Sequence, residues 1–527
     1  MMSEPQDVSG GLDKTKTKYK NVEDVYKTGR KSMPNLVDIN KLKPAEDVEF
    51  ASPVPIQMIS NGEFTPMPQT PKQRQVEERI KELADTHGRK QGLSRRRFLG
   101  TAAGLAAGFV AMNEVFGPVF KVSEAEAADR EMADERAAAL SGQFILDDQT
   151  HLVHDGFMQE GLLGLGLFAA ENWNPALNPE ELTLAYYKFD NYMRQMFVNS
   201  DTKIALLSGA PFDDPSWWML PNDQIADTVA MVNKMAGTRR MLGHFVITPG
   251  QPGWMEAAEK AMQEGRHDGW KSYTIGDPLS PGSEFPYRLD DEKLMYPFYE
   301  KALKAGKRNI AVHKGLMPAD YETSWAGKWE YNTAWDIAKA AKDWPEMNFI
   351  IYHSCMRPFL EPSNIMLDEF NATGELKWAS DLARIPQEHG VSNVYAELGT
   401  TFANSCVTDP RLAAATLGIL IKGMGVDHVV WGTDSVFYGS PQWQIEAMRR
   451  LEIPEDMQRK HGFAPLGAAD GFVKNAIFGL NSARLFNINL RADLDPMFDD
   501  GISKLKRDFA ELDGMRDNVR YGYVSPA

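Results

Sequence analysis

The chain has 527 residues, of which 43% are hydrophobic and 25% are charged, and its formal net charge at pH 7 is −16. This composition is typical of a globular protein with a large core. It excludes a mostly disordered chain and, with only two cysteines, a disulfide-stabilised scaffold. The acidic balance argues against nucleic acid as a partner, and no apolar run reaches the ~18 residues of a membrane span.

Residues 1–90 are polar, rich in Pro, Lys and Glu, and show no sustained apolar period. A segment of this kind cannot bury enough apolar surface to offset its ordering entropy. We therefore predict a disordered extension, or a start codon assigned too far upstream, and in neither case a role in catalysis.

Residues 94–99, Ser-Arg-Arg-Arg-Phe-Leu, follow the pattern of a twin-arginine export signal. An uncharged stretch too short for a membrane span runs from Phe98 to Met112, and residues 125–127, Ala-Glu-Ala, suit signal peptidase. These features predict a signal peptide over 91–127, the twin-arginine translocase as a partner, cleavage before Ala128, and a periplasmic protein. The alternative is a surface helix that carries an arginine cluster.

After residue 140, short apolar runs alternate with segments whose apolar residues recur every three or four positions. This alternation predicts an α/β protein with parallel strands, and eight units in ~290 residues fit a (β/α)8 barrel of the TIM type. We place the barrel domain at 128–490 and a helical tail at 491–527. A doubly wound sheet is the alternative, although no Gly-rich phosphate loop follows the first strand. The predicted strands are 144–151, 203–208, 244–248, 272–276, 309–313, 348–353, 394–398 and 429–433.

Metal-ligand residue types stand at the ends of four predicted strands, where barrel enzymes carry their active sites. These residues are His151, His313, His353 and Asp434. Because side chains alternate along a strand, Gln149 and His151 should point the same way. Nitrogen and carboxylate ligands suit zinc or another first-row divalent ion, and three protein ligands leave a position open for water.

The four strand ends, in this order, resemble the amidohydrolase superfamily, and more narrowly the amidohydrolase-related family of aminocarboxymuconate-semialdehyde decarboxylase, benzoate-type decarboxylases and lactonases. The stretch Lys474–Ile488 resembles the closing helix of that family. The resemblance covers roughly residues 144–490.

This resemblance implies one divalent metal ion, zinc or alternatively manganese, with His151, His313 and Asp434 as ligands. It also implies that Asp434 accepts a proton from bound water and that His353 is catalytic. Gln149 departs from the family, which usually has His there and in some decarboxylases Glu. As a ligand Gln149 could offer only a carbonyl oxygen.

Three further residues near the strand ends are candidates for binding the substrate. Lys314 and Arg357 follow ligand strands and could hold a carboxylate, or could be surface charges. Glu397 ends the seventh strand and could contact the substrate or support a neighbouring site residue.

We expect an exported hydrolase, in which metal-bound water attacks an ester, lactone or amide carbon of a small-molecule substrate. A non-oxidative decarboxylase on the same scaffold and a binding protein without turnover are the alternatives. Whether identical chains associate, and whether Cys355 and Cys406 pair, stays open.

Overall fold

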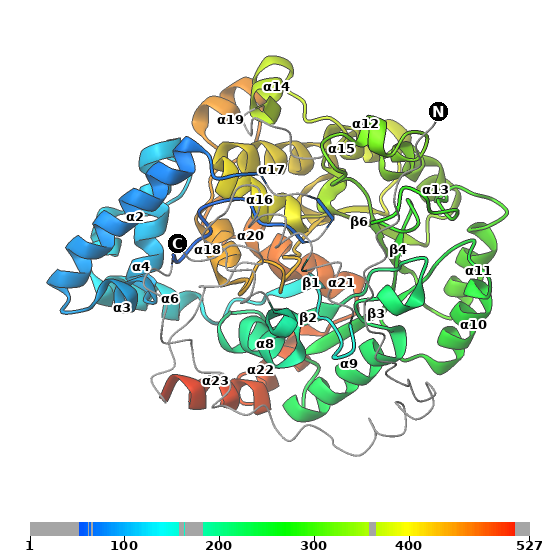
Figure 1. Cartoon of the computed structure of the whole chain (residues 1–527), viewed down its shortest axis with the longest axis horizontal. Coiled ribbons are helices and arrows are strands. Elements are labelled where there is room, and N and C mark those ends of the chain that lie inside the picture. Colours follow the sequence, from blue (N-terminus) through cyan, green and yellow to red (C-terminus); the bar gives the residue numbers. More distant parts are fainter. Residues whose placement is uncertain are drawn as a thin grey trace, which may run out of the picture. The chain divides into compact units, whose positions relative to one another are not determined.

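Eight strands pair in sequence order, each parallel to the next, and form the centre of the computed structural model (Figure 1). The structure describes residues 52–61, 63–64, 67–157, 163, 183–357 and 365–511, all of which belong to one compact unit. The strands are β1 (Leu146–Thr150), β2 (Ile204–Leu207), β3 (Met241–Val246), β4 (Gly269–Tyr273), β5 (Asn309–His313), β6 (Asn348–Tyr352), β7 (Val394–Glu397) and β8 (Val429–Val430).

Hydrogen bonds between β1 and the chain that follows β8 close this sheet into a barrel. Asp148 N donates to Trp431 O at 2.8 Å, Asp434 N donates to Gln149 O at 3.0 Å, and Thr150 forms a parallel bridge with Ser435. The predicted (β/α)8 barrel is thereby confirmed. The register of β1 against β2 shifts between Asp147 and Thr150, at the point where β1 reaches the mouth of the barrel.

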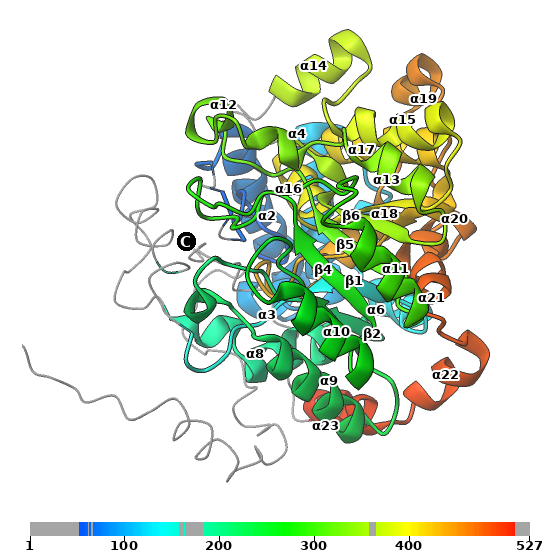
Figure 2. The same ribbon diagram turned by 90° about the vertical axis from the view of Figure 1, so that its right-hand side faces the viewer.

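Helices surround the strands, as Figure 2 shows from the side. The helix α17 begins where the Asp409 side chain accepts a hydrogen bond from Arg411 N and where Pro410 occupies the first turn. The longer helices outside the barrel are α9 (Asn222–Ala236), α10 (Trp254–Glu264), α11 (Tyr296–Lys304), α13 (Ile337–Asp343), α14 (Ile365–Thr373), α15 (Ala379–His389), α16 (Gly399–Thr408), α17 (Pro410–Met424), α18 (Gln442–Arg450) and α19 (Glu455–His461). Short helical segments are η3 (Leu184–Tyr187), α8 (Phe189–Met193), η4 (Arg194–Val198), η5 (Pro215–Trp217), α12 (Tyr321–Ser324), η6 (Trp329–Asn332), η7 (His353–Cys355) and η8 (Val426–His428).

The stretch that resembles a closing helix forms three consecutive turns under the barrel. They are α20 (Phe472–Asn475), η9 (Ala476–Leu480) and α21 (Asn481–Leu485). Leu485 and Phe486 join Leu146 and Ile350 in the apolar core inside the barrel. Two further helices, α22 (Leu490–Met497) and α23 (Gly501–Glu511), follow within the segment predicted as a helical tail.

Helices also occupy part of the segment predicted to be disordered. The helix α2 (Pro71–Lys90) begins at a capping box on Thr70 and buries Val76, Ile80 and Leu83. The structure therefore differs from the prediction over 71–90, because a narrow apolar stripe at helical spacing packs against α4 (Ala102–Phe116) despite the polar average.

The twin-arginine-like segment is folded against the same helices. Ser94 caps α3 (Arg95–Leu99), whose Phe98 and Leu99 are buried, and Arg95 pairs with Asp85 at 2.6 Å. The Ala-Glu-Ala sequence lies in α5 (Glu124–Ala128), which is followed by α6 (Arg130–Leu140). Among the described residues, no helix is both long and apolar enough to cross a membrane. Export and signal peptide cleavage stay predictions.

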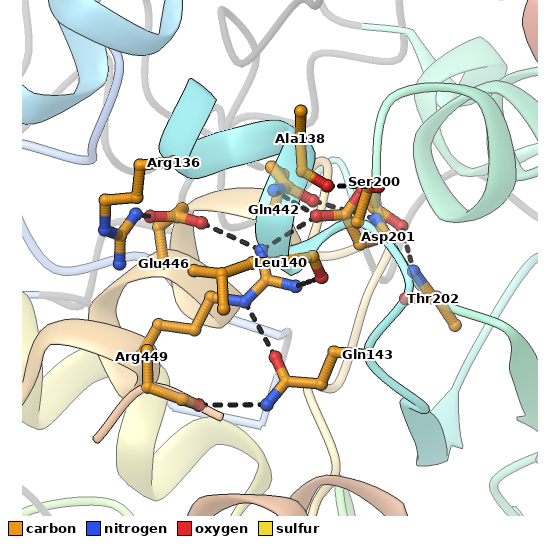
Figure 3. A network of polar contacts seen from close by, with 12 residues as sticks. Arg136, Ala138, Leu140, Gln143, Ser200, Asp201, Thr202, Gln442, Glu446 and Arg449 are labelled. Atoms are coloured by element: carbon orange, nitrogen blue, oxygen red, sulfur yellow. Dashed lines mark hydrogen bonds and ion pairs between the residues drawn. The ribbon is translucent and has the colours of Figure 1, made fainter. Parts of the chain in front are cut away.

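A buried polar network joins α6 and α18 to the chain between the first two strands (Figure 3). Its centre is Arg449, whose guanidinium donates to Asp201 at 2.8 Å, to Glu446 at 2.8 Å and to Gln143 at 2.9 Å. Each charged group is thereby paired, as a buried ion requires.

Cys355 and Cys406 are both buried and free.

Candidate active site

The structure brings the polar residues of the strand ends into one buried cluster at the mouth of the barrel. Gln149 Nε2 lies 3.1 Å from Asp434 Oδ1 and 3.3 Å from the Nε2 atoms of His151 and His353. Gln149 and His151 therefore do point the same way. The amide nitrogen of Gln149 faces the other side chains, and its oxygen has no hydrogen-bond partner among the described residues.

His151 and Asp434 form a pair suited to sharing a proton. His151 Nδ1 donates to Ser208 O at 2.9 Å, which directs Nε2 at Asp434 Oδ1, 3.1 Å away. Asp434 Oδ2 accepts from the hydroxyl of Thr400 at 2.5 Å and from the amide of Asn61 at 3.0 Å. Burial alone would raise the pKa of Asp434, but these partners and the charges of the histidines hold it well below its usual value.

His313 completes the cluster from β5. Its ring stacks on Tyr273 at 4.5 Å between centroids and lies 4.7 Å from the ring of His353. Burial lowers the pKa of His353 to about 3 and that of His313 well below its usual value. Both imidazoles are therefore neutral at pH 7, which is the form that binds a metal ion.

Two site residues have left-handed backbone. The φ angle is 63° at His353 and 57° at Asp434. Such angles cost energy for residues other than glycine and are concentrated at functional sites. Here they turn both side chains from the ends of β6 and β8 into the mouth of the barrel.

The segment before α2 contributes two residues that the sequence analysis missed. Glu63 Oε1 lies 3.5 Å from His313 Nδ1, and Asn61 donates to Glu63 Oε2 at 2.7 Å. Burial and the charge of Asp434 raise the pKa of Glu63 to about 7. No local signal in the polar extension distinguishes these residues, since their position depends on contacts with helices more than 300 positions later.

Lys271 is a second residue that the sequence analysis missed. Its ammonium group lies 3.7 Å from the ring centroid of Tyr352 and 4.7 Å from that of Tyr273, and it has no hydrogen-bond partner among the described residues. Burial lowers the pKa of Lys271, while the carboxylates of Glu63, Asp434 and Glu397 act in the opposite direction. A charged residue directly before the predicted strand 272–276 was the available signal.

Two of the three residues predicted to bind the substrate, Lys314 and Arg357, form ion pairs away from the cluster. Lys314 forms a fully buried ion pair with Asp336 at 2.8 Å, because alternation along the strand turns it away from His313. Arg357 pairs with Glu369 on α14 at 2.5 Å. Neither has a described contact with the cluster, so the structure does not place them on a substrate in it.

Glu397 lies behind the cluster rather than in its opening. Its Oε2 accepts a hydrogen bond from His353 N at 3.0 Å, and its Oε1 would be 1.8 Å from a Cβ atom at Gly432. A Cβ atom at Gly399, where φ is 37°, would lie 2.5 Å from Gln149 Oε1 and 2.8 Å from His353 Nδ1. The absence of side chains at these two glycines leaves the space that the cluster occupies.

The residues present fit a divalent metal ion. One ligand atom from each of Glu63, His313 and His353 lies within 4.8 Å of the others. His313 Nδ1 is buried without a hydrogen-bond partner among the described residues. Two neutral imidazoles and a carboxylate are a donor set that first-row divalent ions prefer.

Several solved structures of low sequence identity are similar to this chain. They include 5-carboxyvanillate decarboxylase of Sphingomonas paucimobilis, with 14% identity and a TM-score of 0.38 over 66% of this chain and 100% of that chain. An uncharacterised TIM-barrel protein of Bordetella bronchiseptica has 12% identity and a TM-score of 0.40 over 65% and 98% of the two chains. A dihydroxybenzoic acid decarboxylase of Polaromonas, solved with manganese and 2-nitroresorcinol, has 14% identity and a TM-score of 0.39 over 66% and 98%.

No curated protein is a significant match to the chain. The family model described as amidohydrolase matches residues 205–488, which is more than half of the 527 residues. This match includes β2 to β8 and the closing turns, and with them His313, His353 and Asp434. The chain therefore belongs to the amidohydrolase family.

Proposed function

We propose that this amidohydrolase-family barrel is a metal-dependent decarboxylase of a small carboxylate substrate. The observation that carries this proposal is Lys271, whose amine is buried beside the cluster without a hydrogen-bond partner among the described residues, where an anionic ligand would favour its ammonium form. A buried ammonium group gains most from an anionic ligand, which a decarboxylation substrate has and a neutral lactone or ester lacks.

The chain's own residues supply the remaining requirements of this reaction. Loss of carbon dioxide breaks the bond between the carboxylate and the adjacent carbon, and a proton must then bond to that carbon. The His151–Asp434 pair, 3.1 Å apart, can hold that proton at the cluster. Tyr273 and Tyr352 offer aromatic surface next to Lys271. A divalent ion bound by His313 and His353 would supply positive charge against the substrate carboxylate.

Hydrolysis is the second candidate, and Asp434 is the observation that favours it. A carboxylate whose pKa is held well below its usual value is ionised at pH 7 and can take a proton from an attacking water. The pattern of the strand ends in the sequence favours this reaction. The position of Lys271, which the sequence does not predict, favours decarboxylation.

The test is a parallel assay of aromatic carboxylates and lactones with protein reconstituted with Mn²⁺ or Zn²⁺. We expect carbon dioxide release from a carboxylate, and we expect Lys271→Met to raise KM for it by ~10-fold or more, as loss of a charge-assisted contact should. Lys234→Met, on the exposed face of α9, is the control and should change nothing. Turnover of lactones alone, unaffected by Lys271→Met, would establish the hydrolase instead.

A further inference from the structure

The segment that precedes α2 enters the mouth of the barrel and is held there by specific contacts. We call residues 52–61 and 63–64 the N-terminal arm. Met58 and Ile59 in the arm are 2% and 1% exposed. Ile59 exchanges two hydrogen bonds with Asn404 of α16, at 3.1 Å and 2.9 Å. Gly108 of α4 leaves room for Val54, whose side chain would lie 3.3 Å from a Cβ atom there.

The arm continues into α2, and the helices that follow are fixed to the barrel. Gln73 donates to Val407 O of α16 at 3.1 Å. Glu126 of α5 pairs with Arg450 of α18 at 2.5 Å, and Arg136 of α6 pairs with Glu446 at 2.6 Å. These contacts are mostly buried, so the arm belongs to the folded protein.

The arm ends at the cluster, where Asn61 joins its two carboxylates. The Asn61 amide donates to Asp434 Oδ2 at 3.0 Å and to Glu63 Oε2 at 2.7 Å. The other oxygen of Glu63 then faces His313 Nδ1 at 3.5 Å. One amide thus fixes the direction in which the Glu63 carboxylate points.

Gln149 is oriented in a way that leaves a ligand position to Glu63. If the Gln149 amide were turned to offer its oxygen, that oxygen would meet Asp434 Oδ1 at the 3.1 Å now spanned by a hydrogen bond. Two acceptors at that distance repel each other, so the nitrogen faces the cluster. The two amide hydrogens of Gln149 can therefore be donated to Asp434 Oδ1 and to His353 Nε2, which leaves His151 Nε2 directed at Asp434, and the oxygen of Gln149 points towards Gly399.

We propose that the N-terminal arm stays on the barrel in the functional protein and that Glu63 is a ligand of its divalent metal ion, together with His313 and His353. Glu63 supplies, from a segment about 90 positions earlier in the chain, the charged ligand that Gln149 cannot supply. The proposal rests on the metal dependence proposed above, but not on which reaction the metal supports.

The first experiment measures metal binding by the full chain, by metal analysis after dialysis against Mn²⁺ or Zn²⁺ and by titration calorimetry. We expect Glu63→Gln to weaken binding by more than ~100-fold, since loss of a residue that only supports a ligand already costs about 10–100-fold. Glu78→Gln, exposed on α2, is the matched control and should bind like the wild type. Circular dichroism checks that both variants are folded.

A second variant guards against a general loss of structure. Gln149→His adds a nitrogen donor on the same strand, and in the Glu63→Gln background we expect it to restore part of the lost affinity. Unchanged metal affinity in folded Glu63→Gln would overturn the proposal. The proposal would also be overturned if native mass spectrometry of protein from its own cells showed a functional species without the arm. The arm would then be an inhibitory pro-segment.

The two proposals fail separately. Metal loss in Glu63→Gln without any decarboxylation by the wild type would reject only the proposed reaction. Decarboxylation by a wild type whose metal affinity does not depend on Glu63 would reject only the role of the arm.

Discussion

The hydroxyl of Thr400, in the first turn of α16, donates a hydrogen bond of 2.5 Å to Asp434 Oδ2. This contact, with the amides of Asn61 and Gln149, surrounds the Asp434 carboxylate with donors. The carboxylate is therefore held in one orientation, with Oδ1 directed at His151.

Asp434→Asn should separate proton transfer from metal binding. Asparagine keeps the shape and tolerates the left-handed φ of 57°, but it cannot carry a proton between groups. We expect turnover to fall by ~10²–10⁴-fold while the metal stays at least partly bound. Wild-type turnover in this variant, at equal metal content, would exclude the His151–Asp434 pair as the proton carrier.

Gly399→Ala should damage the cluster without changing any polar residue. The added Cβ atom would lie 2.5 Å from Gln149 Oε1 and 2.8 Å from His353 Nδ1. Gly237→Ala, at a φ of 79° with nothing within 4 Å, is the control and should cost only the backbone strain of about 1–2 kcal/mol. Because the site would be overpacked, we expect Gly399→Ala to lower the free energy of unfolding, measured with urea, by about 1–3 kcal/mol more than the control does. We also expect Gly399→Ala to lose activity. Equal losses of unfolding free energy in the two variants would mean that the side chains of the cluster can move to make room for the added Cβ atom.

Glu126→Gln tests how firmly α5 is held to the barrel. The variant removes one charge from a buried pair with Arg450, which keeps a contact of 3.2 Å to Glu446. We expect a loss of about 2–3 kcal/mol of unfolding free energy, at or below the low end for a broken buried pair. Glu455→Gln, from an exposed pair with Arg459, should cost less than about 1 kcal/mol.

Glu446 should give the protein an acid-sensitive contribution to stability. Burial would raise its pKa, but Arg450, Arg449 and Arg136 lower it to about 2. Because the pKa of Glu446 is lower in the folded state than in the unfolded state, where it is about 4.5, the ionised carboxylate stabilises the fold above pH 4.5. This stabilisation is lost as the pH falls towards 2. The free energy of unfolding of the wild type should exceed that of Glu446→Gln by a constant amount from pH 7 to 5. About 3 kcal/mol of this difference should be lost between pH 4.5 and 2. A margin that does not change with pH would contradict this.

The barrel could be predicted because most of its strands are short apolar runs that are separated by amphipathic helices. The fifth strand has the predicted bounds, Asn309–His313, whereas β3 and β4 begin three residues before the predicted positions. In β4 the cause is Lys271, a charged side chain inside the barrel that interrupts the apolar pattern. The residue that misled the strand assignment is thus the one on which the proposed function depends.

The cluster of His151, His313, His353 and Asp434 could be predicted because each of these residues stands at the end of a strand or shortly after it, and strand ends converge at one face of a barrel. The roles of Lys314 and Arg357 could not be predicted, since the direction of a side chain beside a strand end depends on one step of register. Asn61 and Glu63 could not be found at all, because only the folded chain brings them to residues so far along the sequence.

The ion pair between α5 and α18 has a consequence for a protein that is cut between Ala127 and Ala128. The pair of Glu126 with Arg450 joins residues on the two sides of the cut, as do the hydrogen bonds of Gln73 and Ile59 to α16. A cut chain can therefore remain one particle held by non-covalent contacts. Such a protein would run as two bands on a denaturing gel and as a single species on a sizing column, with the N-terminal arm still in place.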